Sequence, residues 1–426
     1  MRSEYECLIP TEARGRAVCG PPGLRERRRE VFELRRWMPN KPLFSYQRSL
    51  VGGLLDICEQ ELVYGVVAMP TGAGKTRTIV QFVLDVLATP STQPRLVVWV
   101  APQRELLHQA CETFLSTWSA GMGPDVVDIR ILKTSRGPFE IFRDSIVLLT
   151  PSMLNRVHDR VAPISGIVFD EAHHAPAPKT LHSLTSLQSR SKGVWKFFLG
   201  TTATPFRASM WEMRSMLEIF GDNLYYSSEL GVQPFPELLK SGVLAKPVFQ
   251  KIYGVADYNR RRAISDPRSA RSLVLESDRW SAVIDTICKV VQRPCVVFAL
   301  DRSHGKALCR HLRFSGVSAE YIDGETSPSV RAGVFERFLN RSTEVLVNVG
   351  LLTEGVDCPS AESVVLTYPV ESVVFLRQMI GRVLRGPQVG GTESGFIYSI
   401  DGDQKAIDED TFKVNYSELG WTLCPL

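Results

Sequence analysis

The sequence predicts an α/β protein with two domains, each a mostly parallel sheet flanked by helices. Its 426 residues suffice for two or three domains, because a domain holds roughly 150 residues as a loose guide. Short apolar, β-branched runs alternate with longer segments of helical length, which is typical of parallel sheets with helical connections. The first series of predicted strands comprises residues 62–69, 96–101, 146–150, 166–170 and 196–200.

A second series of predicted strands follows after a break and predicts the second domain. It comprises residues 295–300, 319–322, 344–349, 363–367 and 395–400. Between the two series, residues 228–280 contain four prolines and lose the strand pattern, so we expect a connecting region there. The expected domains are therefore residues 41–227 and 281–400.

The two ends of the chain carry weaker signals. Residues 1–40 are expected to be a basic extension, in which residues 24–37 have the pattern of a charged helix. That helix is either a solvated surface element or a contact with nucleic acid. Residues 401–426 show only a weak mixed pattern, and we assign this C-terminal tail no function.

The composition excludes several classes of protein. No apolar run reaches the roughly 18 to 20 residues of a membrane span, and the first ten residues lack the apolar stretch of a secretion signal. The nine cysteines never occur as C-x-x-C, so neither a disulfide framework nor a zinc finger is predicted. We expect no membrane partner and a cytoplasmic location, with the bacterial cytosol favoured and the nucleus left open. The net charge of +4 neither requires nor excludes a polyanionic partner.

A phosphate-binding loop is the strongest local signal. It directly follows the predicted strand 62–69, precedes a helical pattern, and consists of Pro70, Thr71, Gly72, Ala73, Gly74, Lys75 and Thr76. Small residues let backbone N–H groups approach phosphates, and the helix N-terminus adds positive partial charge. Lys75 is expected to contact the β- and γ-phosphates of a nucleotide and Thr76 to ligate Mg²⁺. Met69 stands where the generic pattern has its first glycine.

Two carboxylates end the predicted strand 166–170. A buried strand tolerates acidic residues only at its solvent-facing end, where a metal and a phosphate make them useful. Asp170 therefore suits Mg²⁺ binding, and Glu171 suits polarisation of the attacking water. His173 and His174 follow. We expect them to form a polar link between the nucleotide site and the rest of the fold. The alternative is that they are metal ligands, but no third ligand stands at a recognisable spacing.

The order of the motifs resembles that of superfamily 2 helicases and translocases over roughly residues 40–400. The phosphate loop is followed by Asp-Glu-Ala-His at 170–173, Thr-Thr-Ala-Thr-Pro at 201–205 and Gln-Met-Ile-Gly-Arg-Val-Leu-Arg at 378–385. With Leu-Leu-Thr-Glu-Gly-Val-Asp-Cys-Pro at 351–359, the set is most similar to the motor subunits of type I and III restriction enzymes and related DNA repair helicases. The resemblance implies two tandem RecA-like domains with a nucleotide cleft between them.

The resemblance also implies roles for residues outside the phosphate loop. Gln47 corresponds to the residue that recognises adenine, the alternative being an ordinary surface residue. Gly355 and Asp357 belong to the motif that contacts the nucleotide. Thr202 and Thr204 occupy the motif that couples the nucleotide site to the domain interface, although both are equally suited to capping a strand end.

Three residues of the last motif complete the predicted catalytic set. Arg382 and Arg385 are three apart on an expected helix and Gln378 lies four residues before Arg382, so all three are expected on one face. The guanidinium groups are expected to stabilise charge on the γ-phosphate, and Gln378 to contact water or phosphate. The alternative is an exposed basic helix.

Contacts with nucleic acid are expected at loops after predicted strands. The resemblance assigns them to Gln103, Arg104, Thr150, Pro151, Asp301, Arg302 and Thr353. None of these residues reads base edges in an obvious way. We therefore expect contacts with the sugar–phosphate backbone that do not depend on the nucleic-acid sequence. Plain loop or capping duty is the alternative for each.

These features together predict an ATP- and Mg²⁺-dependent helicase or translocase. DNA is favoured over RNA by the resemblance and not by residue chemistry. One alternative is an ATP-switched, DNA-clamping subunit of a larger defence or repair complex, with protein partners and without unwinding. A nucleotide hydrolase that does not act on nucleic acid is a third hypothesis.

Overall fold

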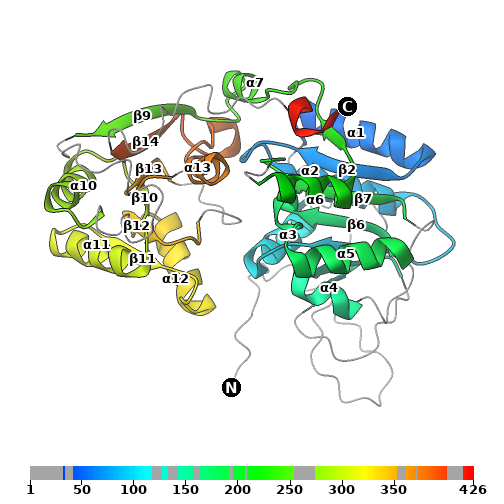
Figure 1. Ribbon diagram of the computed structural model, residues 1–426, viewed down its shortest axis with the longest axis horizontal. Helices are drawn as coiled ribbons and strands as arrows, with labels where there is room; N and C mark the ends of the chain where they lie inside the picture. Colours follow the sequence, from blue (N-terminus) through cyan, green and yellow to red (C-terminus); the bar gives the residue numbers. More distant parts are fainter. Residues whose placement is uncertain are drawn as a thin grey trace, which may run out of the picture. The chain divides into compact units, whose positions relative to one another are not determined.

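The computed structural model describes eleven stretches of the chain, in which two sheets form (Figure 1). The described residues are 32–33, 42–117, 127–132, 143–157, 164–190, 195–206, 209–253, 274–352, 361–370, 372–400 and 416–426. Each sheet carries helices in the connections between its strands, so the predicted α/β class with two mostly parallel sheets is confirmed. No described helix combines the length and the apolar character needed to cross a bilayer.

The first sheet has nine described strands in the order β1-β4-β5-β3-β6-β7-β2-β8-β15. In chain order they are β1 (Phe32–Glu33), β2 (Val63–Ala68), β3 (Leu96–Val100), β4 (Asp128–Ile131), β5 (Ser145–Leu149), β6 (Ile164–Asp170), β7 (Phe197–Thr202), β8 (Asn223–Tyr226) and β15 (Thr422–Pro425). The pairings of β4, β5, β3, β6 and β7 are parallel, as are those of β2, β8 and β15. Its helices are α1 (Ser45–Gln60), α2 (Lys75–Ala88), α3 (Arg104–Thr117), α4 (Pro151–Val157), α5 (Pro178–Arg190) and α6 (Met210–Phe220), with 3₁₀ helices η2 (Ala172–His174) and η5 (Ser417–Leu419).

Aromatic side chains fill much of the core around the first sheet. Strands β3, β5 and β7 are buried at every residue, which explains the apolar runs at 96–100, 146–149 and 197–199 within them. Trp99 of β3 meets Phe114 of α3 edge to face at 5.5 Å between ring centroids. At Gly166 a Cβ atom would lie 2.2 Å from the ring of Phe197, so only glycine fits between these two strands.

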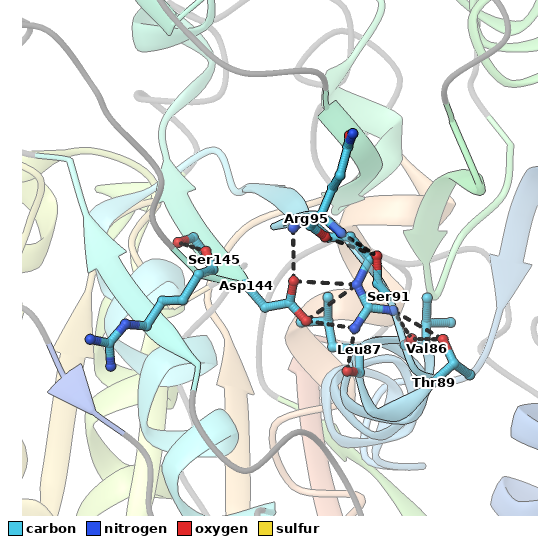
Figure 2. Close-up of polar contacts among 9 residues, drawn as sticks. Val86, Leu87, Thr89, Ser91, Arg95, Asp144 and Ser145 are labelled. Carbon is cyan, nitrogen blue, oxygen red and sulfur yellow. Dashed lines mark hydrogen bonds and ion pairs between the residues drawn. The ribbon is translucent and has the colours of Figure 1, made fainter.

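An ion pair at the amino end of the first sheet anchors the C-terminal end of α2 (Figure 2). The Arg95 guanidinium contacts both carboxylate oxygens of Asp144, and its Nη1 donates to the carbonyl oxygen of Val86 at 2.8 Å. Its Nη2 donates to the carbonyl oxygen of Leu87. The last carbonyl groups of a helix lack intrahelical donors, so Arg95 satisfies groups that would otherwise need solvent.

The second sheet has six described strands in the order β11-β12-β10-β13-β14-β9, and every pairing is parallel. The strands are β9 (Lys246–Ile252), β10 (Cys295–Phe298), β11 (Ala319–Ile322), β12 (Val345–Asn348), β13 (Ser363–Leu366) and β14 (Ser394–Ile400). Its helices are α10 (Ser277–Lys289), α11 (Arg302–Phe314), α12 (Pro328–Leu339) and α13 (Val373–Ile380), with the 3₁₀ helix η3 (Pro387–Val389). Helix α7 (Phe235–Lys240) precedes β9 along the chain.

Two local expectations are wrong. Residues 228–280 do contain a strand, because β9 pairs with β14 along its whole length. The charged helix expected over 24–37 cannot include Phe32–Glu33, which form β1 antiparallel to β4; the rest of that segment lies outside the described residues. Residues 416–426, for which the sequence predicts no element, contain β15, which pairs with β8, and the Trp421 indole donates to the carbonyl oxygen of Pro205 at 2.7 Å.

Candidate functional site

The phosphate loop connects β2 to α2, as the sequence predicts. The helix begins at Lys75, and the N–H of Ala73 donates to the carbonyl oxygen of Pro70 at 3.1 Å to close the turn. Gly72 and Gly74 have φ values of 87° and 81°, a conformation that is costly for residues with a Cβ atom. Positive φ at alternate residues before a helix N-terminus turns successive N–H groups towards one anion. These residues therefore fit the phosphates of a nucleotide.

Met69 explains how the loop tolerates the missing first glycine. Its backbone N–H donates to the carbonyl oxygen of Thr202 at 3.2 Å, so the chain still follows the neighbouring strand at this point. The side chain is buried, at 3% exposure. Because Met69 lacks the positive φ of Gly72 and Gly74, glycine is not required there.

Asp170 and Glu171 lie at the carboxyl end of β6. Asp170 is 1% exposed and its Oδ1 accepts hydrogen bonds from the Thr201 hydroxyl at 2.6 Å and from the Glu171 N–H at 3.1 Å. These donors compensate for burial of the carboxylate. Its chemistry suits a divalent cation, for which oxygen ligands are preferred.

Glu171 has a left-handed backbone, with φ 54° and ψ 58°. Such a conformation costs a residue with a long side chain of order 1 kcal/mol, and it recurs at functional sites. The Oε2 atom of Glu171 lies 3.5 Å from Nδ1 of His173, which is 1% exposed. The rings of His173 and His174 are 4.5 Å apart. His173 therefore contacts the predicted base, in keeping with the expected polar link.

Thr201 is the residue of this region that sequence reasoning missed. The strand register pairs Thr201 with Asp170, and its hydroxyl bonds to the carboxylate. The Thr202 hydroxyl instead accepts from the N–H of Thr204 at 3.0 Å, a capping contact that matches the alternative weighed for it. The Thr204 hydroxyl is buried and has no hydrogen-bond partner in the described part of the chain.

Gln47 is buried in the first turn of α1, at 1% exposure, so the alternative of a surface residue is wrong. Its Oε1 accepts from the N–H of Phe44 at 3.0 Å, and the rings of Phe44 and Tyr46 stack at 5.5 Å. Burial raises the pKa of Tyr46, which the positive charge of Arg77 opposes. That interaction associates the start of α1 with the first turn of α2.

Two loops predicted to hold nucleic acid are neighbours on the first sheet. Gln103 and Arg104 follow β3, and Thr150 and Pro151 follow β5. The two strands pair in register to their last residues, so both loops leave the same edge of the sheet. The Thr150 hydroxyl lies 3.0 Å from that of Ser152.

The corresponding residues of the second sheet make capping contacts and ion pairs. Asp301 caps α11 by accepting from the N–H of His304 at 2.8 Å. Arg302, whose side chain is 49% exposed, pairs with Glu325 and lies 3.6 Å from Asp323. Thr353, Gly355 and Asp357 lie outside the described residues.

The prediction of a shared helix face for the last motif is wrong. Helix α13 ends at Ile380 with Gly381 as its cap, so Gln378 is helical whereas Arg382 and Arg385 are not. Arg385 instead forms an isolated antiparallel bridge with Leu244. Glycine ends helices readily, and the backbone bridge then fixes the course of the chain. Gln378 is 6% exposed.

Two family models match the chain. That of the res subunit of type III restriction enzymes matches residues 40–207, and that of the conserved C-terminal domain of helicases matches residues 278–387. Both matches agree with the resemblance to superfamily 2 helicases, since the first covers the phosphate loop and the acidic pair and the second covers the Gln-x-x-Gly-Arg motif.

Helicases are also among the individual relatives. "Putative ATP-dependent helicase IRC3" of Saccharomyces cerevisiae is 25% identical over 250 residues, which is 57% of this chain and 35% of that protein. "Putative mitochondrial ATP-dependent helicase irc3" of Schizosaccharomyces pombe is 25% identical over 354 residues, 80% of this chain and 54% of that protein. The chain thus spans about half or less of the length of these two relatives.

Solved structures of similar fold include two enzymes bound to DNA. The "ATP-dependent Type ISP restriction-modification enzyme LlaBIII bound to DNA" has a TM-score of 0.59 and 16% identity, covering 85% of this chain and 28% of that one. The "Mycobacterium smegmatis helicase Lhr bound to ssDNA and AMP-PNP" has a TM-score of 0.56 and 18% identity, covering 84% and 48%. At this identity the likeness concerns the fold, which is that of tandem RecA-like domains.

Proposed function

We propose that the chain is the motor of an ATP-dependent helicase or translocase that moves on nucleic acid, with DNA favoured over RNA. One observation carries the proposal: the end of β7 contacts both halves of the nucleotide site. The Thr201 hydroxyl bonds to Asp170, and the next residue, Thr202, accepts the N–H of Met69 at the start of the phosphate loop. Such a link is what an enzyme needs to hold a bound phosphate and a metal ligand at fixed positions relative to each other.

The phosphate loop binds the triphosphate of ATP in this proposal. Lys75 places positive charge against the β- and γ-phosphates, and Gln47 recognises the adenine edge. Thr76 and Asp170 are the residues that would hold Mg²⁺, which when bound neutralises charge on the phosphates. The buried Asp170 with its two donors supports this assignment.

Glu171 serves as the general base. Its carboxylate accepts a proton from the water that attacks the γ-phosphate, and its contact with His173 orients it for that role. The left-handed backbone of Glu171 supports the assignment, since strain of this kind persists where function requires a defined side-chain direction.

Residues of the second sheet supply the remaining charge. Arg382 and Arg385 stabilise negative charge on the γ-phosphate, Gln378 contacts water or phosphate, and Gly355 and Asp357 complete the nucleotide contacts. Thr202 and Thr204 couple hydrolysis to domain movement. The buried Thr204 hydroxyl supports this, because among the described residues it has no partner and can accept one on closure.

Nucleic acid is held through its backbone. The neighbouring loops after β3 and β5 support a continuous contact by Gln103, Arg104, Thr150 and Pro151. In the second predicted domain, Asp301, Arg302 and Thr353 are assigned the same role. DNA is favoured because LlaBIII and Lhr, which share the fold, are described as bound to DNA.

Rates of ATP hydrolysis measured side by side with single-stranded DNA, duplex DNA and RNA test the proposal. We expect DNA to stimulate turnover strongly, and Lys75→Ala to abolish it. Turnover that ignores all three nucleic acids contradicts the proposal. Strand displacement on a partial duplex then separates a helicase from a translocase or from a DNA clamp within a defence or repair complex, since a clamp hydrolyses ATP without displacing a strand.

A further inference from the structure

Three buried polar side chains gather at the carboxyl end of the second sheet, and the proposed function does not use them. They are Arg279 of α10, Asn348 at the end of β12 and Thr367 directly after β13, with exposures of 2%, 0% and 1%. We call them the buried polar cluster. Burial of polar groups costs free energy unless each is hydrogen-bonded, so their bonds reveal what they hold in place.

Thr367 fixes the end of β10, the central neighbour of β12 and β13. Its hydroxyl donates to the carbonyl oxygen of Phe298 at 2.7 Å. Its own carbonyl oxygen accepts from Nη2 of Arg279 at 3.0 Å. Phe298 is the last residue of β10, and four residues later the chain reaches Arg302, one of the residues assigned to nucleic acid.

Asn348 joins β10 to the segment after β12. Its Nδ2 donates to the carbonyl oxygen of Val297 at 3.1 Å, and its Oδ1 accepts from the N–H of Leu352 at 3.2 Å. Leu352 directly precedes Thr353, another residue assigned to nucleic acid. Only a side chain with both a donor and an acceptor makes both bonds, so Asn348 is suited to this position by its chemistry.

His304 secures the loop that follows β10. Its Nδ1 accepts from the N–H of Leu300 at 3.2 Å, and its own backbone N–H donates to Asp301. Burial lowers the pKa of His304 to about 4, against the opposing charge of Asp301 and with the aid of Arg279, so the ring stays neutral near pH 7 and keeps its acceptor. The loop is thus held at Phe298, Leu300 and Asp301.

We propose that Arg279, Asn348 and Thr367 are positioning residues, which hold the loop that leads to Arg302 and the residues after β12 up to Leu352 in the conformation that binds the sugar–phosphate backbone of nucleic acid. This inference rests on the proposed function. It adds the residues that preorganise the proposed nucleic-acid contacts after strands of the second sheet. Backbone contacts set the register of a protein on nucleic acid, so a shift in either segment weakens binding. Preorganised segments also lose less conformational entropy on binding.

Strand β13 offers a matched pair of variants for the test. Thr367→Val keeps the shape of the side chain at the carboxyl end and removes its hydroxyl. Ser363→Ala removes a hydroxyl at the amino end of the same strand, where it donates to the carbonyl oxygen of Gln292. In the full-length chain we measure the concentration of single-stranded DNA that gives half-maximal stimulation of ATP hydrolysis, together with the melting temperature.

We expect Thr367→Val to raise that DNA concentration about tenfold, because the Phe298 carbonyl loses its hydroxyl donor, keeps the longer bond from the Thr367 N–H at 3.4 Å, and the loop shifts. Asn348→Leu should act in the same direction, and Thr367→Ser, which keeps the hydroxyl, should restore near wild-type behaviour. Ser363→Ala should lower the melting temperature alone. Equal effects of Thr367→Val and Ser363→Ala on the DNA concentration overturn the inference. A wild-type chain that DNA does not stimulate overturns the proposed function, and this inference with it.

Discussion

The two ends of the first sheet each hold a carboxylate that is largely withdrawn from solvent, Asp144 at the amino end with 14% side-chain exposure and Asp170 at the carboxyl end with 1% exposure overall. Helix α2 starts at the carboxyl end and finishes at the amino end. At the amino end, Asp144 meets the opposite charge of Arg95, which also caps α2 (Figure 2). At the carboxyl end, Asp170 accepts from a hydroxyl and a backbone N–H, beside the strained backbone of Glu171. We propose that the amino end serves chiefly to stabilise the fold and that the carboxyl end binds the ligand, since the strained backbone of Glu171 lies at the carboxyl end.

The largest expected effect is on turnover at the carboxyl end. Glu171→Gln removes the proposed base and should lower the rate of ATP hydrolysis about 10³-fold while ATP binding persists. Asp144→Asn is the matched change at the amino end and should leave the turnover of folded protein near that of the wild type. Rates and nucleotide affinities of both variants check this. Normal turnover in Glu171→Gln would show that another group accepts the proton.

The next largest effect is on stability at the amino end. Arg95→Ala removes the charged partner of the Asp144 carboxylate, which keeps the backbone N–H of residue 95, and leaves carbonyl groups of α2 without their donor, so the free energy of unfolding should fall by about 3 kcal/mol. Denaturant unfolding followed by tryptophan fluorescence measures this. Below the unfolding transition, ATP hydrolysis per folded molecule should stay within about twofold of the wild type. A larger loss would mean that the far end of α2 controls the phosphate loop.

A smaller effect is expected from the hydroxyl that contacts the proposed metal ligand. Thr201→Val removes one donor from Asp170 and should lower turnover about tenfold, with a higher Mg²⁺ concentration needed for half-maximal rate. Ser145→Ala removes a buried hydroxyl bond at the amino end and serves as the control. An unchanged Mg²⁺ requirement in Thr201→Val would assign Thr201 to packing instead.

The sequence predicts those features that depend on neighbours along the chain. Buried parallel strands such as β3 read as continuous apolar runs, and the phosphate loop is a local pattern of glycines before a helix. Strand β9 was missed because half-exposed edge residues interrupt its apolar pattern, and β15 because it is short and ends in proline. Gly381 is a signal for the end of a helix, but the three-residue spacing of Arg382 and Arg385 favoured a helix that continues through them.

The details of the candidate site depend on register, which local sequence does not contain. Thr201, Thr202 and Thr204 are all hydroxyl residues of one motif, and only the pairing of β6 with β7 selects Thr201 as the partner of Asp170. The bond of Asn348 to Val297 likewise requires β12 to lie beside β10. Such contacts join residues that long stretches of chain separate.

The smallest expected effect concerns backbone strain at the carboxyl end. Glu171→Asn places a residue that tolerates left-handed backbone at φ 54°, so it should raise the free energy of unfolding by about 0.5–1 kcal/mol while abolishing turnover. Arg341 is the other non-glycine residue with positive φ in the described part of the chain, and Arg341→Asn should stabilise similarly but keep turnover. Urea unfolding and ATP hydrolysis of both variants distinguish strain that serves catalysis from strain that does not. A loss of stability in Glu171→Asn would mean that contacts of the Glu171 side chain outweigh the strain of its backbone.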